Sequence, residues 1–163
     1  MNFYQLASTV FTLDEGTGPP GGKPYKDMKG SWTIGIGHFI GERLEDMRLS
    51  PEMIDALFVE DLAIAIREAR FVVGNTFFDN LPVPRQIALV SMLFTLGRNK
   101  FLKFEPTIEA MKQHNWEEVA NRILASKWAR DVDPKQRYNE GRDDRIAYMF
   151  KTGEFHPQYG IKA

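Results

Sequence analysis

The sequence predicts an α+β fold dominated by helices, with one small β-hairpin near the N-terminus. Two observations predict it. Apolar residues recur at helical spacing near the N-terminus, from 51 to 73 and in the later segments. A single stretch from 25 to 38 instead gathers aromatic and β-branched residues around Gly30, which is typical of two strands and a turn.

The composition fits one soluble domain and excludes several classes of function. A chain of 163 residues buries a sizeable core and needs no staples. It has no Cys, which excludes disulfides, thiolate nucleophiles and cysteine metal sites. The net charge is -1, from 21 basic and 22 acidic residues, which argues against a nucleic-acid-binding protein.

The charges are unevenly spread along the chain. Residues 1–97 carry 8 basic and 12 acidic side chains, a net of -4, whereas 98–163 carry 13 and 10, a net of +3. The C-terminal excess fits either contact with an anionic polymer or ordinary scatter of surface charge.

The first element is a short helix, in which apolar residues from Phe3 to Phe11 recur at helical spacing and stop before Asp14. Glu15 should therefore lie at a helix end. The N-terminus has no basic n-region and no long apolar run, so we expect neither a signal peptide nor a membrane anchor.

A loop and a hairpin should follow. The Gly- and Pro-rich run from 16 to 24 suits neither a helix nor a strand interior. From Tyr25 to His38 we expect a hairpin with Gly30 in its turn, as the only clear β element. Gly35 and Gly37 are expected inside a strand, marking a bulge or a close approach to the backbone.

A long helix from 51 to 73 is the best-defined element. Ser50 provides an N-cap, Pro51 suits the first helical position, and Gly74 ends the helix. Within a single domain, 1–163, we expect this helix to join a lobe of about 12–60 to a lobe of about 74–163 that also holds the N-terminal helix.

The rest of the chain is helical in pattern. The segment 83–96 is apolar nearly all round and should be central. Further helices are expected at 106–113, at 116–126 with Asn115 as its cap, and near 141–152. The polar stretch 129–140 indicates a loop or a short turn of helix.

Glu15 and Asp27 form the candidate catalytic pair, because they flank the loop and could face one cleft. Glycosidases use two such carboxyls, one to protonate the leaving oxygen and one to activate water or attack carbon. Position alone does not establish the pair, since the chain has 22 acidic residues and most acids are simply solvated.

The segment around this pair resembles the active-site segment of the phage-type lysozymes, glycoside hydrolase family 24. The residues that carry the resemblance are Asp14-Glu15-Gly16, Tyr25-Lys26-Asp27, Gly30 and Trp32-Thr33-Ile34-Gly35-Ile36-Gly37-His38. Later matches in the family's order are 88–94, Ser126-Lys127-Trp128, Gly141-Arg142-Asp143-Asp144-Arg145 and 150–153. The resemblance covers nearly the whole chain and implies a helix-dominated, lysozyme-like α+β fold.

By this resemblance, Glu15 is the general acid, Asp27 the general base, and Thr33 the hydroxyl that holds the attacking water. A Glu packed at a helix end beneath the hairpin could have its pKa raised by desolvation, while Asp27 in a wetter strand would stay ionised. The resemblance implies an inverting mechanism, for which the carboxyls should lie roughly 6.5–9.5 Å apart.

The resemblance also implies supporting and substrate-binding residues. Arg142 would pair with Glu15 and Arg145 with Asp14, although an exposed basic face is the alternative for the two arginines. His38 would form a structural ion pair with Asp61. Phe39, Phe94, Thr95 and Lys127 match positions along the family's saccharide cleft, although each residue type is more often core or plain surface.

The implied activity is a muramidase that cleaves the β-1,4 bond between N-acetylmuramic acid and N-acetylglucosamine, for lysis of bacterial cell walls by a phage. Peptidoglycan is the expected partner. We expect a monomer without nucleic-acid binding, membrane insertion, cofactor or metal, since His38, His114 and His156 lack ligand spacing. The enzyme should wait in the host cytoplasm until a separate factor permeabilises the membrane.

Two other functions stay open. A lytic transglycosylase needs one acid and no water-activating base, so Asp27 argues against it. A non-catalytic wall-binding or virion-structural module would keep the fold without turnover, which the complete set of catalytic residues disfavours. The sequence does not distinguish a free endolysin from a virion-associated enzyme.

Overall fold

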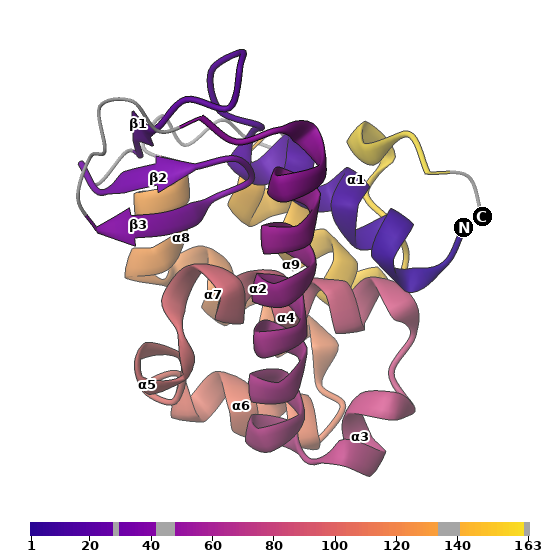
Figure 1. Ribbon diagram of the computed structural model, residues 1–163. Coiled ribbons are helices and arrows are strands. Elements are labelled where there is room, and N and C mark those ends of the chain that lie inside the picture. The colour runs from indigo at the N-terminus through magenta and orange to yellow at the C-terminus, as the bar shows by residue number, and fades with distance from the viewer. Residues whose placement is uncertain (28–29, 42–47, 134–140, 162–163) are drawn as a thin grey trace. The chain divides into compact units, whose positions relative to one another are not determined.

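A computed structural model describes residues 1–27, 30–41, 48–133 and 141–161 (Figure 1). It confirms the predicted class, because helices dominate and the only sheet in these ranges has three short strands. The chain divides into two units, Met1–Ile64 and Ala65–Ala163. The first helix belongs to the first unit, whereas we expected it in the C-terminal lobe. The expected arrangement of lobes stays a prediction.

Helix α1, Phe3–Glu15, opens the first unit. Asn2 and Gln5 form a capping box at its start, because each side chain accepts a hydrogen bond from the other residue's backbone amide. The helix is longer than expected, since Thr12 to Glu15 continue it until Gly16, whose amide still donates to the Thr12 carbonyl. Glu15 is therefore its last residue.

The predicted hairpin is confirmed between β1, Tyr25–Lys26, and β2, Trp32–Ile34, which pair antiparallel. The sequence missed a third strand, β3, His38–Gly41, which pairs antiparallel with β2 (Figure 1). The placement of Gly35 and Gly37 inside a strand was wrong. They form the turn between β2 and β3, with φ values of 58° and 72° that favour glycine.

Helix α2 spans Pro51–Val73, as predicted. The Ser50 hydroxyl accepts a hydrogen bond from the Met53 amide, and Gly74 after the helix still donates to the Arg70 carbonyl. The boundary between the two units falls inside α2. In the first unit the Phe58 ring of α2 meets the Phe11 ring of α1 edge to face, with centroids 5.5 Å apart.

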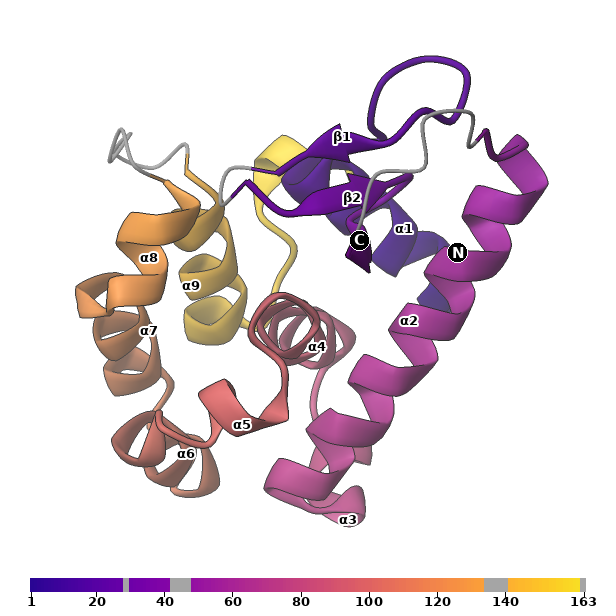
Figure 2. The ribbon, with the colours of Figure 1, turned by 60° about the vertical axis from the view of Figure 1, so that its left-hand side comes forward.

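The second unit contains, after the end of α2, a set of shorter helices (Figure 2). They are α3 Asn75–Asp79, α4 Val83–Leu96, α5 Arg98–Phe101, α6 Glu105–Lys112, α7 Trp116–Ala125, α8 Lys127–Val132, α9 Arg142–Thr152 and the 3₁₀ helix η1 Pro157–Tyr159. Helix α4 is central as predicted, because every residue from Ile87 to Leu93 is buried and both α5 and α9 pack against it.

The predicted helix bounds hold to within one residue for four elements of the second unit, α4, α6, α7 and α9. Asn115 caps α7 by accepting from the Glu118 amide over 3.3 Å. The stretch 129–140 was predicted as loop or a short turn of helix, and its first residues belong to helix α8. Residues 134–140 of this stretch lie outside the described ranges. The short elements α3, α5 and η1 were missed.

No helix in the described ranges combines the length and apolar character needed to cross a membrane.

Candidate active site

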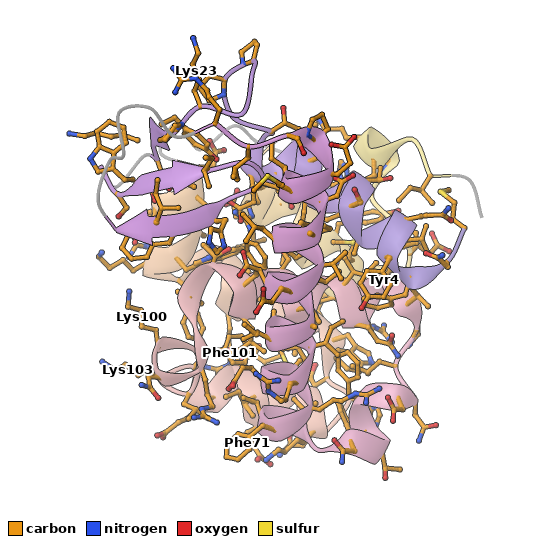
Figure 3. All side chains as sticks on the ribbon, in the orientation of Figure 1. Tyr4, Lys23, Phe71, Lys100, Phe101 and Lys103 are labelled. Carbon is orange, nitrogen blue, oxygen red and sulfur yellow. The ribbon has the colours of Figure 1, made fainter. Side chains whose placement is uncertain are left out.

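Glu15 lies at the C-terminal end of α1, next to Asp14, and both are partly buried. The helix stops there because Gly16 adopts φ 76°, ψ 176°, which turns the chain into the loop that leads to β1. Glu15 thus lies between helix α1 on its N-terminal side and the Gly- and Pro-rich loop on its C-terminal side. Figure 3 shows Lys23 on this loop.

Asp27 follows β1 directly and is held by Ser31 across the hairpin turn. The Asp27 amide donates to the Ser31 carbonyl over 3.0 Å, and the Ser31 amide donates to Asp27 Oδ1 over 2.8 Å. The Gly30 amide also donates to the Asp27 carbonyl, over 2.9 Å. One carboxylate oxygen therefore fixes the turn, and the orientation of the side chain is defined by backbone groups.

Thr33 stands opposite Tyr25 in the β1–β2 pairing, so both side chains lie on the same face of the sheet. Thr33 is only 4% exposed, and its hydroxyl donates to the Ser31 carbonyl over 3.2 Å. A hydroxyl has one proton and two lone pairs. Since the proton is directed to Ser31, any water held by Thr33 would donate to its oxygen.

The charges of both carboxylates act on the phenol of Tyr25. Burial raises the pKa of its phenol above the ordinary value of 10.0, and the charges of Glu15 and Asp27 act in the same direction, against a hydrogen bond with the Gly37 backbone that lowers it. Both carboxyls are thus close enough to the same phenol to act on it electrostatically. Tyr25 and Thr33 face each other in the β1–β2 pairing, and Asp27 follows β1 directly.

His38 and Asp61 are in contact, as the resemblance implied. His38 Nδ1 in β3 lies 2.6 Å from Asp61 Oδ2 in α2, and the two side chains are 29% and 24% exposed. The pair joins the sheet to the helix within the first unit. Its role in supporting the site stays a prediction.

The two predicted arginines lie in the second unit, at the start of α9, and are buried. Arg142 Nη2 donates to Ser91 Oγ over 3.1 Å and to Thr95 Oγ1 over 2.7 Å. Arg145 Nη1 donates to Gln158 Oε1 over 3.1 Å. The expected pairs of these arginines with Glu15 and Asp14 would join residues of different units and stay predictions.

The predicted substrate-binding residues differ in exposure. Phe39 in β3 is 65% exposed, which leaves its ring available to a ligand. Lys127 starts α8 with an exposed side chain whose Nζ lies 3.2 Å from Asp131 Oδ2. Phe94 and Thr95 are partly buried near the end of α4, where Thr95 binds Arg142. Their roles stay predictions.

Within the described ranges, no three His, Cys, Asp or Glu side chains are grouped so that they could hold a metal ion.

Tyr25 and Ser31 were not singled out from the sequence as site residues. Tyr25 was used only as a strand former, although its place in Tyr25-Lys26-Asp27 was part of the matched motif. Ser31 acts through its backbone amide and carbonyl, and no side-chain pattern indicates such a role. The register of the hairpin was needed to find both.

Comparison with known proteins identifies the family of the chain. The family described as Phage lysozyme matches residues 20–142, which include Asp27 and Thr33. Two similar proteins from Dictyostelium discoideum are named Probable T4-type lysozyme 2 and 1. They are 29% and 26% identical over 152 residues, which cover 79% of this chain and 85% of each relative. Peptidoglycan hydrolase gp36 of Pseudomonas phage phiKMV is 29% identical over 66% of this chain and 12% of its own length.

The helix-dominated α+β fold and the family match together define a lysozyme-like protein, and the chain is a glycoside hydrolase. It belongs to the phage lysozyme family, whose match covers most of the chain.

Proposed function

We propose that this protein is a muramidase, which hydrolyses the β-1,4 bond between N-acetylmuramic acid and N-acetylglucosamine in peptidoglycan. Family membership supports peptidoglycan hydrolysis as the activity, in line with the name of the phage relative. The observation that supports the finer assignment is that the Asp27 carboxylate and the Thr33 hydroxyl are both hydrogen-bonded to Ser31, in the hairpin that follows Glu15 in the chain.

In this mechanism Glu15 gives its proton to the glycosidic oxygen as the bond to the anomeric carbon breaks. Asp27 takes a proton from a water molecule, whose oxygen attacks that carbon from the opposite face. The second proton of this water is directed to the Thr33 oxygen, which has lone pairs to accept it because its own proton goes to Ser31. The product would have the inverted, α configuration.

The decisive variant is Glu15→Gln, which keeps the size and shape of the side chain and removes the transferable proton. We expect the release of reducing ends from purified peptidoglycan to fall by roughly 100- to 10,000-fold. The melting temperature should stay near that of the unmodified protein. Glu60→Gln, at an exposed position of α2, is the matched control and should retain full activity. Full turnover by Glu15→Gln would show the assignment to be wrong.

Product analysis separates the proposal from a lytic transglycosylase. Hydrolysis yields reducing muramic ends, which NMR recorded early in the reaction should detect as the α anomer. Mass spectrometry that found 1,6-anhydro products instead would favour the transglycosylase. Binding to cell walls with no product of either kind would favour a non-catalytic module.

A role in phage lysis belongs to the same proposal, and so does release from the host cytoplasm by a separate membrane-permeabilising factor. The family match and the phage relative support it. Expression inside bacteria should leave the cells intact until the inner membrane is permeabilised, and should then cause rapid lysis. Lysis of cells whose inner membrane stays intact would contradict this route.

A further inference from the structure

The ring of Tyr25 is in direct contact with the loop that joins Glu15 to Asp27. A Cβ atom on Gly18 would lie 2.7 Å from Tyr25 Cε1, closer than real Cβ atoms come, and 3.0 Å from Cδ1. Gly18 also has φ +71°, which L side chains rarely adopt. The loop therefore reaches the ring only because position 18 is glycine.

The other end of the same side chain holds the turn between β2 and β3. The phenol donates to the Gly35 carbonyl over 3.1 Å, and a backbone hydrogen bond links it to Gly37. Gly35 in turn lies against α2, because a Cβ atom there would be 2.8 Å from Ile54 Cγ2. Tyr25 thus connects a loop without regular structure to a turn that is packed on a long helix.

The phenol of Tyr25 is not placed to act as an acid. Its single proton is donated to Gly35, and burial together with the two negative charges keeps the group neutral. The position of the Tyr25 ring instead affects the path of the loop between Glu15 and Tyr25. The segment between Glu15 and Tyr25 contains four glycines and three prolines and has no helix or strand, so other contacts must fix its path.

We propose that Tyr25 is a positioning residue that sets the separation of the Glu15 and Asp27 carboxyls, by holding the 16–24 loop against the Gly35–Gly37 turn. This inference rests on the proposed function of the two acids. An inverting glycosidase needs room for one water between its carboxyls, and a displacement of about 1 Å can cost about 100-fold in rate.

The first test is Tyr25→Phe, which keeps the ring against Gly18 and removes the bond to Gly35. We expect kcat to fall about tenfold or more, with KM within about twofold, because the acids are displaced while substrate contacts remain. The interval between the acidic and basic limbs of the pH–kcat profile should also change, since the coupling of two carboxyls depends on their separation. Tyr4→Phe, at a position of α1 that is 43% exposed (Figure 3), is the control and should change none of these.

The second test approaches the same contact from the loop. Gly18→Ala places a methyl group on the Tyr25 ring, whereas Gly21→Ala introduces a methyl group with nothing within 4 Å at a similar φ of +79°. Both variants carry the same kind of backbone strain. Only Gly18→Ala should show the lowered kcat and the altered pH profile. If Tyr25→Phe fails to fold at the assay temperature, this pair decides the question.

Unchanged kcat and pH profile in folded Tyr25→Phe would overturn the inference, as would equal kinetics for Gly18→Ala and Gly21→Ala. The same assay with Glu15→Gln keeps the two proposals apart. If Glu15→Gln is inactive while Tyr25→Phe behaves normally, the muramidase proposal stands and only the positioning role fails. If Glu15→Gln is active, the catalytic assignment itself fails.

Discussion

Asp27 and Ser31 are joined by two hydrogen bonds across the hairpin turn, one through the backbone and one through Asp27 Oδ1. The same Ser31 carbonyl that accepts the Asp27 amide also accepts the Thr33 hydroxyl. The proposed base and the proposed water-binding hydroxyl are therefore oriented by one residue. Asp27 has a structural role in the turn besides its proposed chemical role.

These two roles of Asp27 can be separated by two substitutions. Asp27→Asn keeps an oxygen that accepts from the Ser31 amide, whereas Asp27→Ala removes it. Both should lower kcat by about 100-fold or more, because neither side chain takes up a proton from water. Only Asp27→Ala should also lower the free energy of unfolding, by about 1 kcal/mol. Kinetics and urea denaturation of both variants test this, and substantial turnover by Asp27→Asn would rule out a general base at this position.

The contact between His38 and Asp61 predicts a loss of stability without a loss of chemistry. His38→Asn and Asp61→Asn should each lower the free energy of unfolding by about 1–2 kcal/mol, because a hydrogen bond to a carboxylate stabilises the fold and partial exposure of both side chains limits the gain. Thermal melts and peptidoglycan assays below the melting temperature check this. A His38→Asn variant that is stably folded yet inactive would instead place His38 in the catalytic machinery.

The buried contact between Arg142 and Ser91 should stabilise the second unit. Ser91 is fully buried in α4, and its hydroxyl accepts from Arg142 Nη2 over 3.1 Å. Ser91→Ala leaves that donor with one partner fewer and should lower the free energy of unfolding by about 1–3 kcal/mol. Ser8→Ala in α1 is the control, and it should be neutral or slightly stabilising because Ala favours helices. Equal stability of the two variants would argue against the contact.

The raised pKa of the Asp143 carboxyl leads us to expect that the stability of the protein falls as pH rises through this pKa. Burial raises the pKa of its carboxyl, the charges of Asp144 and Asp133 act in the same direction, and backbone hydrogen bonds oppose the shift. An Asp whose pKa is higher in the folded chain than in the unfolded chain favours folding when protonated. The stability that protonated Asp143 contributes is complete below the ordinary pKa of about 3.8. It is lost as pH rises from there through the raised pKa of the folded chain.

Asp143→Asn removes this titration and should raise the melting temperature at neutral pH. The gain should vanish at a pH well below the ordinary Asp value, where the carboxyl of the unmodified protein is protonated. Asp55→Asn, at an exposed position of α2, serves as the control and should show no such pattern. A lower melting temperature for Asp143→Asn at neutral pH would contradict the prediction, and would indicate that the charge is favourable at the start of α9.

The regular elements with strong local signals were predictable. Helix α2 begins and ends where Ser50, Pro51 and Gly74 indicated, because caps and breakers act within one turn of the chain. Strand β3 was missed, since His38–Gly41 is only four residues long, too short for a clear alternating pattern, and is defined by pairing with β2. The four- and five-residue helices α5 and α3 were missed for a similar reason, because helices so short depend on packing.

Some residues of the candidate site were predicted from the sequence, and Tyr25 was not. Glu15, Asp27 and Thr33 were singled out through the motif around them, and their catalytic roles stay predictions. The role of Tyr25 depends on the strand register and on the path of the glycine loop. Neither follows from the type of residue at position 25, since aromatic residues are common in strands.

The sequence by itself determined the helical class, the limits of α2, the hairpin around Gly30 and the identity of the proposed acid and base. These depend on periodicity, caps, turn residues and a short motif, which all act between near neighbours. Only the tertiary structure decided which groups meet. Tyr25 reaches Gly35 across 10 positions, His38 reaches Asp61 across 23, and Arg142 reaches Ser91 across 51. Such pairs form because folding must satisfy polar groups as they become buried, wherever in the chain their partners lie.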